Sequence, residues 1–236
     1  MAQTALITGA NKGIGFEIAR LLAERGITAV IGARDESRGK AAAGKLGLPF
    51  VRLDVTEPAT VQAAAKWIER AYGTLDILVN NAGINATEPY RQPSSTYLAT
   101  IRSLYETNVF GVVTVTNAML PLLRRSPAGR IVNQSSTLGS KKRMLDQQGP
   151  LWPINNLPGC SSKAALNMIT VSYAKELWDT PIKVNCCDPG WCATDANGHT
   201  GFRTAAQGAE IAVRLATLGD DGPTGGFFGD DGPLPW

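Results

Sequence analysis

The sequence is poor in the residues that hold metal ions. It contains a single histidine, His199, and four cysteines among 236 residues. None of Cys160, Cys186, Cys187 and Cys192 belongs to a C-x-x-C pair, so a zinc site is not expected. We therefore expect no metal cofactor, and we expect buried free thiols in a reducing compartment.

Long apolar runs and strong charge are also missing. The longest apolar stretch, 109–123, is interrupted by threonine and asparagine and is shorter than the ~18 residues of a membrane span. The first residues show no charged-then-apolar signal segment. The net charge is only +3, and the longest basic run is 141–143. We expect a cytoplasmic protein, monomeric or homo-oligomeric, that acts on a small molecule and has no membrane or nucleic-acid partner.

Strand and helix patterns alternate along the whole chain. This alternation predicts one α/β domain over 1–236, a doubly wound Rossmann domain with about seven parallel strands flanked by helices. The segment 138–159 has three prolines and little periodicity, so we expect it to be a substrate loop. The expected strands are 4–7, 27–33, 50–55, 75–79, 130–134, 183–187 and 226–228, and the expected helices are 16–23, 36–46, 56–71, 95–123, 161–177 and 204–218.

The stretch 8–15 lies between the first apolar run and the first helical pattern. Strand, glycine turn and helix in succession favour a nucleotide-binding turn, because glycine lets the backbone approach a pyrophosphate and the helix N-terminus offers unpaired N–H groups. Gly9, Gly13 and Gly15 are spaced G-x-x-x-G-x-G, unlike the G-x-G-x-x-G of many dehydrogenases. The alternative is a tight turn that holds no ligand.

The residues after the second and third strands bear on the choice of cofactor. Arg34 directly follows the second strand, and Lys12 lies inside the glycine turn. Two cations can neutralise a 2′-phosphate, so NADP(H) is favoured over NAD. Alternatively, Arg34 is solvated and Asp35 binds the ribose. Asp54 is expected to hold the adenine, or else to serve only as a turn residue.

Six motifs in order resemble the successive signatures of the short-chain dehydrogenase/reductase family, and most of all its NADPH-dependent carbonyl reductase branch. The resemblance covers essentially the whole chain. The motifs are Thr8–Gly15, Asn80-Asn81-Ala82-Gly83, Asn108, Ser135-Ser136, Ser162-Lys163-Ala164-Ala165-Leu166-Asn167 and Asp188-Pro189-Gly190-Trp191.

The resemblance implies three catalytic residues. Ser136 would hydrogen-bond the substrate oxygen, Lys163 would hold the nicotinamide ribose, and Asn108 would anchor a water in a proton relay. Their plainer alternatives are a strand-end cap, a surface charge and the filler of a helix kink, respectively. The candidate cofactor-binding residues are Gly9, Asn11, Lys12, Gly13, Ile14, Gly15, Arg34, Asp54, Val55, Asn81, Ala82, Gly83, Lys163, Pro189, Gly190 and Thr194.

The family's catalytic tyrosine is missing. The pattern Tyr-x-x-x-Lys places it four residues before Lys163, where this chain has Gly159. The neighbouring Cys160 points in another helical direction, and a thiol is a poorly matched acid unless its pKa is shifted. A positioned general acid contributes about 10²–10⁴ in rate, so ketone reduction is expected to be slow but not abolished. An iminium carbon accepts hydride without that acid.

The remaining pocket candidates are Gly159, Trp191, Cys192, Ala196 and Met144. Small residues at 192 and 196 would enlarge the pocket, unless they are ordinary loop residues. We expect an NADPH-dependent oxidoreductase that transfers hydride to a bulky, apolar carbonyl-type substrate. Alternatives are a reductase of C=N bonds and a disabled NADPH-binding protein. The missing tyrosine together with the small residues at 192 and 196 also suggests an engineered variant.

Overall fold

The protein is described from a computed structural model that covers residues 3–86 and 92–236. Its centre is a sheet with the order β3-β2-β1-β4-β5-β6-β7-β8. Neighbours are parallel from β3 to β7, and β8 is antiparallel to β7. The strands are β1 Thr4–Thr8, β2 Thr28–Ala33, β3 Phe50–Arg52, β4 Ile77–Asn80, β5 Arg130–Gln134, β6 Lys183–Cys187, β7 Phe227–Gly229 and β8 Gly232–Pro233. The doubly wound fold is confirmed, with eight strands instead of about seven.

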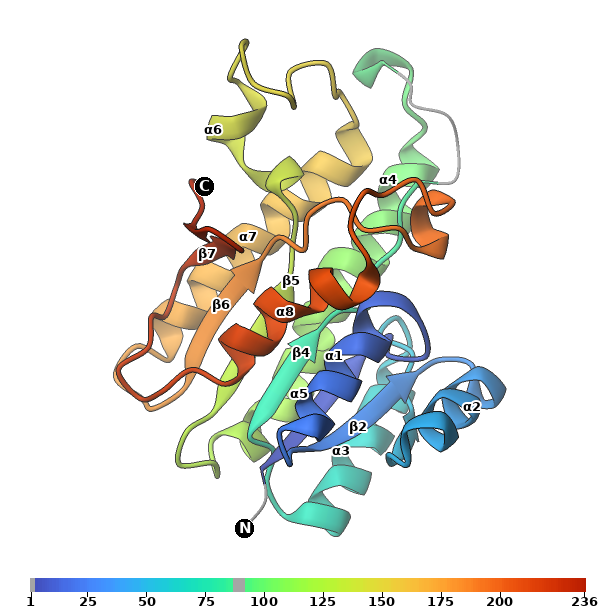
Figure 1. The fold of residues 1–236 in the computed structure, drawn as a ribbon, viewed down its shortest axis with the longest axis vertical. Helices are drawn as coiled ribbons and strands as arrows, with labels where there is room; N and C mark the ends of the chain where they lie inside the picture. The colour runs from blue at the N-terminus through green and yellow to red at the C-terminus, as the bar shows by residue number, and fades with distance from the viewer. Residues whose placement is uncertain (1–2, 87–91) are drawn as a thin grey trace.

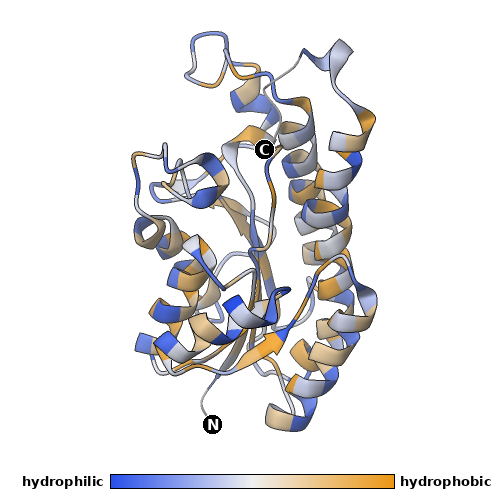
Figure 2. Cartoon of the chain, turned by 90° about the vertical axis from the view of Figure 1, so that its right-hand side faces the viewer, coloured by the Kyte–Doolittle hydropathy of each residue, from blue (hydrophilic) through white to orange (hydrophobic). Residues whose placement is uncertain are grey.

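Helices cover both faces of this sheet (Figure 1), and the view turned by 90° shows the sheet between the two helical layers (Figure 2). One apolar core joins the sheet to α1, α2 and α8, and a second joins it to α3, α5 and α7. The helices are α1 Gly13–Glu24, α2 Glu36–Leu46, α3 Pro58–Tyr72, α4 Leu98–Tyr105, α5 Gly111–Leu123, α6 Lys141–Met144, α7 Leu157–Glu176 and α8 Ala205–Ala216. No helix in the described ranges is long and apolar enough to cross a membrane.

The strand order reverses direction at β1, which pairs with β2 on one side and β4 on the other. In open parallel sheets, ligands bind in the crevice outside the carboxyl ends of the strands at such a point. The loops that follow β1, β4, β5 and β6 all leave the sheet at this edge. They carry most of the site residues expected from the sequence.

The helix expected over 95–123 is interrupted. A 3₁₀ turn, Pro93–Ser95, precedes α4, and a π-helical turn, Glu106–Phe110, separates α4 from α5. A side chain at Gly111 would come within 2.7 Å of Val55, so the start of α5 packs closely on the segment after β3. The π turn places Asn108 in the buried interior.

The segment 138–159 is more ordered than a loop. A 3₁₀ turn, Thr137–Gly139, overlaps its start, and it contains the short helix α6. Helix α7 begins at Leu157 instead of Ser161, because Asn156 caps its first turn and Pro158 occupies a position where a missing N–H is tolerated. Gly159 therefore lies inside the first turn of α7.

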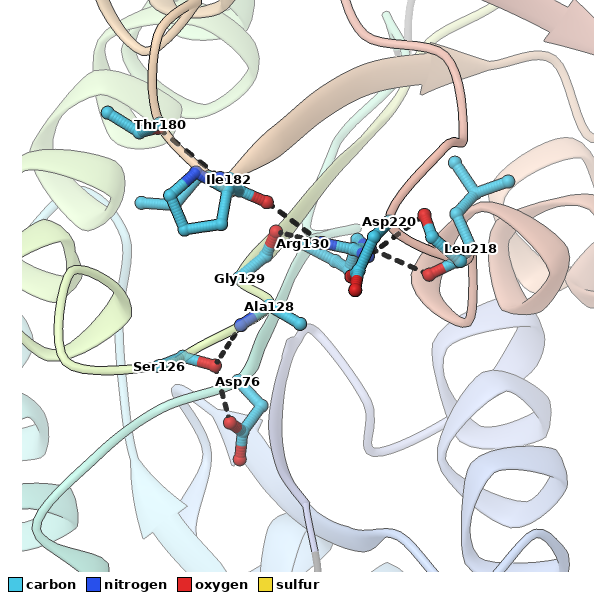
Figure 3. A network of polar contacts seen from close by, with 11 residues as sticks. Asp76, Ser126, Ala128, Gly129, Arg130, Thr180, Ile182, Leu218 and Asp220 are labelled. Carbon is cyan, nitrogen blue, oxygen red and sulfur yellow. Dashed lines mark hydrogen bonds and ion pairs between the residues drawn. The ribbon is translucent and has the colours of Figure 1, made fainter.

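At the amino ends of the parallel strands, Arg130 is buried and contacts two loops, the one before β6 and the one after α8 (Figure 3). Its guanidinium donates to the backbone oxygens of Leu218 at 2.9 Å and Gly219 at 3.0 Å, and to that of Pro181 at 3.1 Å. It also pairs with the exposed Asp220 at 3.3 Å. This network holds the start of β5 to the chain that follows α8.

Candidate functional site

The glycine turn packs directly against the segment after β4. Gly9 and Gly13 have φ angles of +66° and +59°, a region that glycine adopts without strain. A side chain at Gly9 would come within 2.9 Å of the Ala82 backbone, and one at Gly15 would collide with Asn81. The turn is thus a cradle that Cβ atoms would fill, which fits the close approach of a dinucleotide.

Thr8 and Asn81 fix the two walls of this cradle. The Thr8 hydroxyl accepts from the backbone N–H of Asn81 and of Ala82, each at 3.0 Å. The Asn81 amide donates in return to the Thr8 backbone oxygen at 2.9 Å. The carboxyl ends of β1 and β4 are therefore locked together, with the glycine turn above them.

The cation expected after β2 is available. Arg34 is exposed and has no hydrogen bond or ion pair within the described residues. Asp35, its rival for the ribose, caps α2 instead, accepting from the Arg38 backbone at 2.9 Å and the Arg38 side chain at 3.0 Å. The backbone hydrogen bond from Arg38 is the main cause that lowers the Asp35 carboxyl pKa. Because Asp35 is already bound to Arg38, Arg34 is favoured as the residue that contacts the 2′-phosphate of the cofactor.

Sequence reasoning missed two further cations, Arg38 and Lys45, which lie beside the expected Lys12. An open cleft of about 370 Å³ adjoins the glycine turn and is lined by Lys12, Arg38 and Lys45 among others. Arg38 follows Arg34 by four residues, which was the available signal. Its guanidinium currently pairs with Asp35 at 2.9 Å.

Lys12 joins the glycine turn to the loop after β6. Its ammonium contacts Asp195 at 2.6 Å, and His199 contacts the other oxygen of Asp195 at 2.9 Å. The Lys12 hydrogen bond is the main cause that lowers the pKa of Asp195. A side chain at Gly13 would meet Thr194 of the same loop at 3.6 Å. The expected cofactor residues 12, 13 and 194 are thus brought together.

Asp54 behaves as a turn residue. Its carboxylate accepts from the Thr56 backbone at 3.0 Å and from the Thr56 hydroxyl at 2.7 Å. The neighbouring Val55 is buried against Gly111. An adenine contact from Asp54 stays a prediction.

Ser136 and Lys163 both lie near the carboxyl end of β5. Ser136 is the second residue after the strand, and its hydroxyl accepts from the Leu138 backbone N–H at 3.2 Å. The Lys163 ammonium, from α7, donates to the Gln134 backbone oxygen at 2.7 Å. Burial of this ammonium lowers the Lys163 pKa to about 8.

Asn108 connects the segment after β4 to α7. Its amide accepts from the Ile84 backbone N–H at 2.9 Å and donates to the Ile84 oxygen at 3.0 Å and to Ser162 at 3.3 Å. A side chain at Gly83 would lie 3.4 Å from Asn108 and 3.9 Å from the Lys163 ammonium. Two expected catalytic residues thus flank one expected cofactor residue.

Gly159 lies one helical turn before Lys163, so the two positions share a face of α7. Its N–H donates to the Asn156 side-chain oxygen at 3.2 Å. A Cβ at Gly159 would come within 2.7 Å of the Asn156 Nδ2. Asn156, which sequence reasoning missed, therefore occupies the space next to the position where the Cβ of the expected tyrosine would lie. An asparagine two residues before a proline was the available signal, because it is a common helix cap.

The loop after β6 carries the other pocket candidates. The Trp191 indole donates to the Thr200 oxygen at 3.2 Å, and the Ala196 oxygen accepts from Asn85 at 3.2 Å. The Cys192 thiol donates to the Pro189 oxygen at 3.3 Å and packs against Gly208, so this side chain anchors the loop to α8. Gly190 has a φ of +73°, and Met144 ends α6. Their contacts with a substrate stay predictions.

Among the described residues, no three His, Cys, Asp or Glu side chains lie close enough together to hold a metal ion.

Known proteins resemble the chain over nearly its full length. The model of the short chain dehydrogenase family matches residues 3–203. (-)-Isopiperitenone reductase of Mentha piperita is 33% identical, with 98% of this chain and 97% of that protein covered. The structure of salutaridine reductase from Papaver somniferum has 32% identity and a TM-score of 0.83 over 97% of this chain and 99% of that one. The NADPH-bound carbonyl reductase from chicken fatty liver has 28% identity and a TM-score of 0.84 over 100% and 99%.

Proposed function

The chain belongs to the short-chain dehydrogenase family, and on that premise we propose that it transfers hydride to a bulky, apolar carbonyl substrate without a tyrosine acid. It is an oxidoreductase with NADP(H) as its cofactor, in line with the NADPH-bound carbonyl reductase that it resembles. When bound, NADPH supplies the hydride that forms the new C–H bond, while the carbonyl π pair moves to oxygen. The observation that carries the proposal is the convergence of Gly83, Asn108 and Lys163.

Each residue has a distinct role in this proposal. The glycine cradle and Arg34 bind the two ends of the adenosine diphosphate portion, and Lys163 holds the nicotinamide ribose. The Ser136 hydroxyl, which lies near the end of β5, donates a hydrogen bond to the substrate oxygen. Asn108 fixes the segment 81–84 against α7, so that the cofactor and the substrate oxygen keep their relative positions. Such positioning supplies much of the rate without proton transfer.

Exposed apolar side chains support a bulky, apolar substrate. Leu145 is 74% exposed and Trp152 is 48% exposed, and both lie between α6 and the start of α7. Trp191 is also exposed, in the loop after β6. An apolar molecule that enters beside Gly159 would cover such surface, with a gain of about 25 cal/mol for each Å² buried.

The tyrosine's absence is tested by restoring it. Because a Cβ at 159 meets Asn156, the variant combines Gly159→Tyr with Asn156→Ser, since serine also caps helices and is shorter. We expect this pair to raise kcat for a bulky aryl ketone by about 10²-fold or more, followed by loss of NADPH absorbance. The matched control, Gly159→Phe with Asn156→Ser, adds the ring without the hydroxyl and should give no such gain.

A second candidate function is reduction of C=N bonds, which Gly159 favours because a preformed iminium needs no proton from the enzyme. The same variants decide between the two. If the parent reduces a cyclic iminium and the tyrosine pair loses that activity, C=N reduction is the function. If the parent binds NADPH and oxidises it with neither substrate, the protein is a disabled NADPH-binding protein and the proposal is wrong.

A further inference from the structure

The side chain of Asn167 is buried between α7 and the sheet, one helical turn after Lys163. Its Oδ1 accepts from the Ser135 hydroxyl at 2.5 Å and from the Cys186 thiol at 3.6 Å. Its Nδ2 has no hydrogen-bond partner among the described residues. A buried amide N–H without a partner costs free energy, and leucine would fill a similar volume without that cost. The contact that the amide oxygen makes with Ser135 therefore calls for an explanation.

Helix α7 contacts the end of β5 at two consecutive residues. The Lys163 ammonium donates to the Gln134 backbone oxygen at 2.7 Å, and Asn167 accepts from the Ser135 side chain. The Ser135 backbone N–H donates to the Cys187 oxygen of β6 at 2.7 Å. Ser135 is therefore fixed from two sides, by α7 through its side chain and by β6 through its backbone.

Ser136 is the next residue, and it begins the 3₁₀ turn that follows β5. Its hydroxyl accepts from the Leu138 N–H at 3.2 Å, and its backbone oxygen accepts from the Gly139 N–H at 2.9 Å. The far end of this turn packs on α7, because a side chain at Gly139 would come within 2.7 Å of the Lys163 backbone. The conformation of Ser136 therefore depends on how firmly Ser135 is held before it.

A second polar contact joins the same two elements at a greater distance from Ser136 along the strand. Asn133 of β5 donates from its side-chain amide to the Thr170 hydroxyl of α7 at 2.9 Å. Both side chains are buried, as are those of Ser135 and Asn167. This pair is thus a matched comparison, since it is a buried hydrogen bond between β5 and α7 that does not adjoin Ser136.

From these contacts we propose that Asn167 is a positioning residue, which acts through Ser135 to hold the Ser136 hydroxyl where it can donate to the substrate oxygen. The inference rests on the proposed function. When the contact is lost, the start of the turn gains freedom to move. A displacement of about 1 Å in a group that contacts the substrate can cost about 10²-fold in rate.

Three variants test this role by kinetics. Asn167→Leu and Ser135→Ala each remove one partner, and their combination removes both. We expect each single variant to lower kcat for an aryl ketone by about 10-fold or more, with an unchanged dissociation constant for NADPH. In the double variant no buried partner is left unpaired, so the thermal midpoint should recover, but kcat should stay low. Recovery of kcat together with the thermal midpoint would overturn the proposal.

The matched control is Thr170→Val, which removes the comparison hydrogen bond from the same helix. It should lower the thermal midpoint and leave kcat at the parent value. A fall in kcat as large as that of Asn167→Leu would show that general loosening between α7 and β5 is the cause, and would overturn the positioning role.

Hydrogen exchange separates this inference from the proposed function, because it needs no turnover. The Leu138 and Gly139 amides donate to Ser136, so their exchange reports on the turn directly. We expect these amides to exchange about 10-fold faster or more in Asn167→Leu than in the parent, and no faster in Thr170→Val. Equal exchange in the parent and Asn167→Leu rejects the inference. Faster exchange in Asn167→Leu supports it, whereas failure of the proposed function appears as no ketone turnover by the parent.

Discussion

Asn108 holds both backbone groups of Ile84, accepting from its N–H at 2.9 Å and donating to its oxygen at 3.0 Å. This two-point contact fixes the chain directly after the segment that forms the cofactor cradle. It depends on the π turn, which carries Asn108 into the buried interior. Such turns occur often at functional sites.

Asn108→Ala should reduce both stability and catalysis. The substitution leaves the partly buried Ile84 backbone groups without their Asn108 partner, at a cost of about 1 kcal/mol or more in the free energy of unfolding. Urea unfolding measures this loss, and kcat should fall with it because the segment 81–84 loosens. Asn117→Ala, which removes only a surface hydrogen bond to Tyr173, is the control and should change little.

Arg34→Asp should weaken the binding of NADPH and spare that of NADH. A charge-assisted hydrogen bond to the 2′-phosphate is worth about 1.5–3 kcal/mol, or roughly 10–100-fold in the dissociation constant. Fluorescence titration with both cofactors measures the ratio. Arg25→Asp, at the far end of α1, should leave it unaltered. Unchanged NADPH affinity in Arg34→Asp would show that another cation binds the 2′-phosphate.

Asp195→Asn should tighten NADPH binding by a few-fold. Asp195 now neutralises the Lys12 ammonium at 2.6 Å, and its removal leaves that cation free for the cofactor. His199→Gln removes the other partner of Asp195 and serves as the control. Weaker NADPH binding in Asp195→Asn would mean that the ion pair serves to hold the loop after β6 over the cofactor.

The pH dependence of stability should carry the signature of Lys163. Burial lowers its pKa from 10.5 to about 8, so the unfolded chain binds more protons at this residue between these two values. Stability therefore gains from this group as the pH rises from about 8 toward 10.5. Urea unfolding of the parent, compared with Lys163→Met across that window, should show a difference that grows with pH. A constant difference would place the ammonium in a solvated setting.

Arg130→Met should lower the free energy of unfolding by about 3 kcal/mol, because several partly buried backbone oxygens lose the donor that the buried guanidinium provides. Thermal and urea unfolding measure the change. Asp220→Asn removes only the exposed partner, which is 90% exposed, and should cost little. A large loss in Asp220→Asn would show that the ion pair, and not the backbone contacts, dominates.

The sequence predicts the fold well because the apolar strands and the amphipathic helices of a doubly wound sheet have clear periods. It predicts the boundaries near the site less well. The π turn around Asn108 puts extra residues into one turn of the helical segment, and the spacing of apolar residues in the sequence does not reveal it. The start of α7 is hidden because Leu157, Pro158 and Gly159 include two of the weakest helix formers, and the cap at Asn156 compensates for them.

The site residues divide in a similar way. Motif spacing indicates Lys163 and Ser136, because the family resemblance covers them directly. Asn156 and Arg38 carry no motif, and their positions depend on a cap and a cleft that exist only in three dimensions. Tertiary contacts of this kind leave no regular spacing in the chain.

The Arg130 network lies at the amino end of β5, and Ser136 follows the carboxyl end of the same strand. The length of β5 therefore separates the Arg130 network from the candidate catalytic residues. Mutations in the loops after β5 and β6 therefore leave the Arg130 network untouched. A directed-evolution library targeted to the loops after β5 and β6 should retain a high fraction of folded members. The same separation gives this scaffold the freedom to drift toward new substrates.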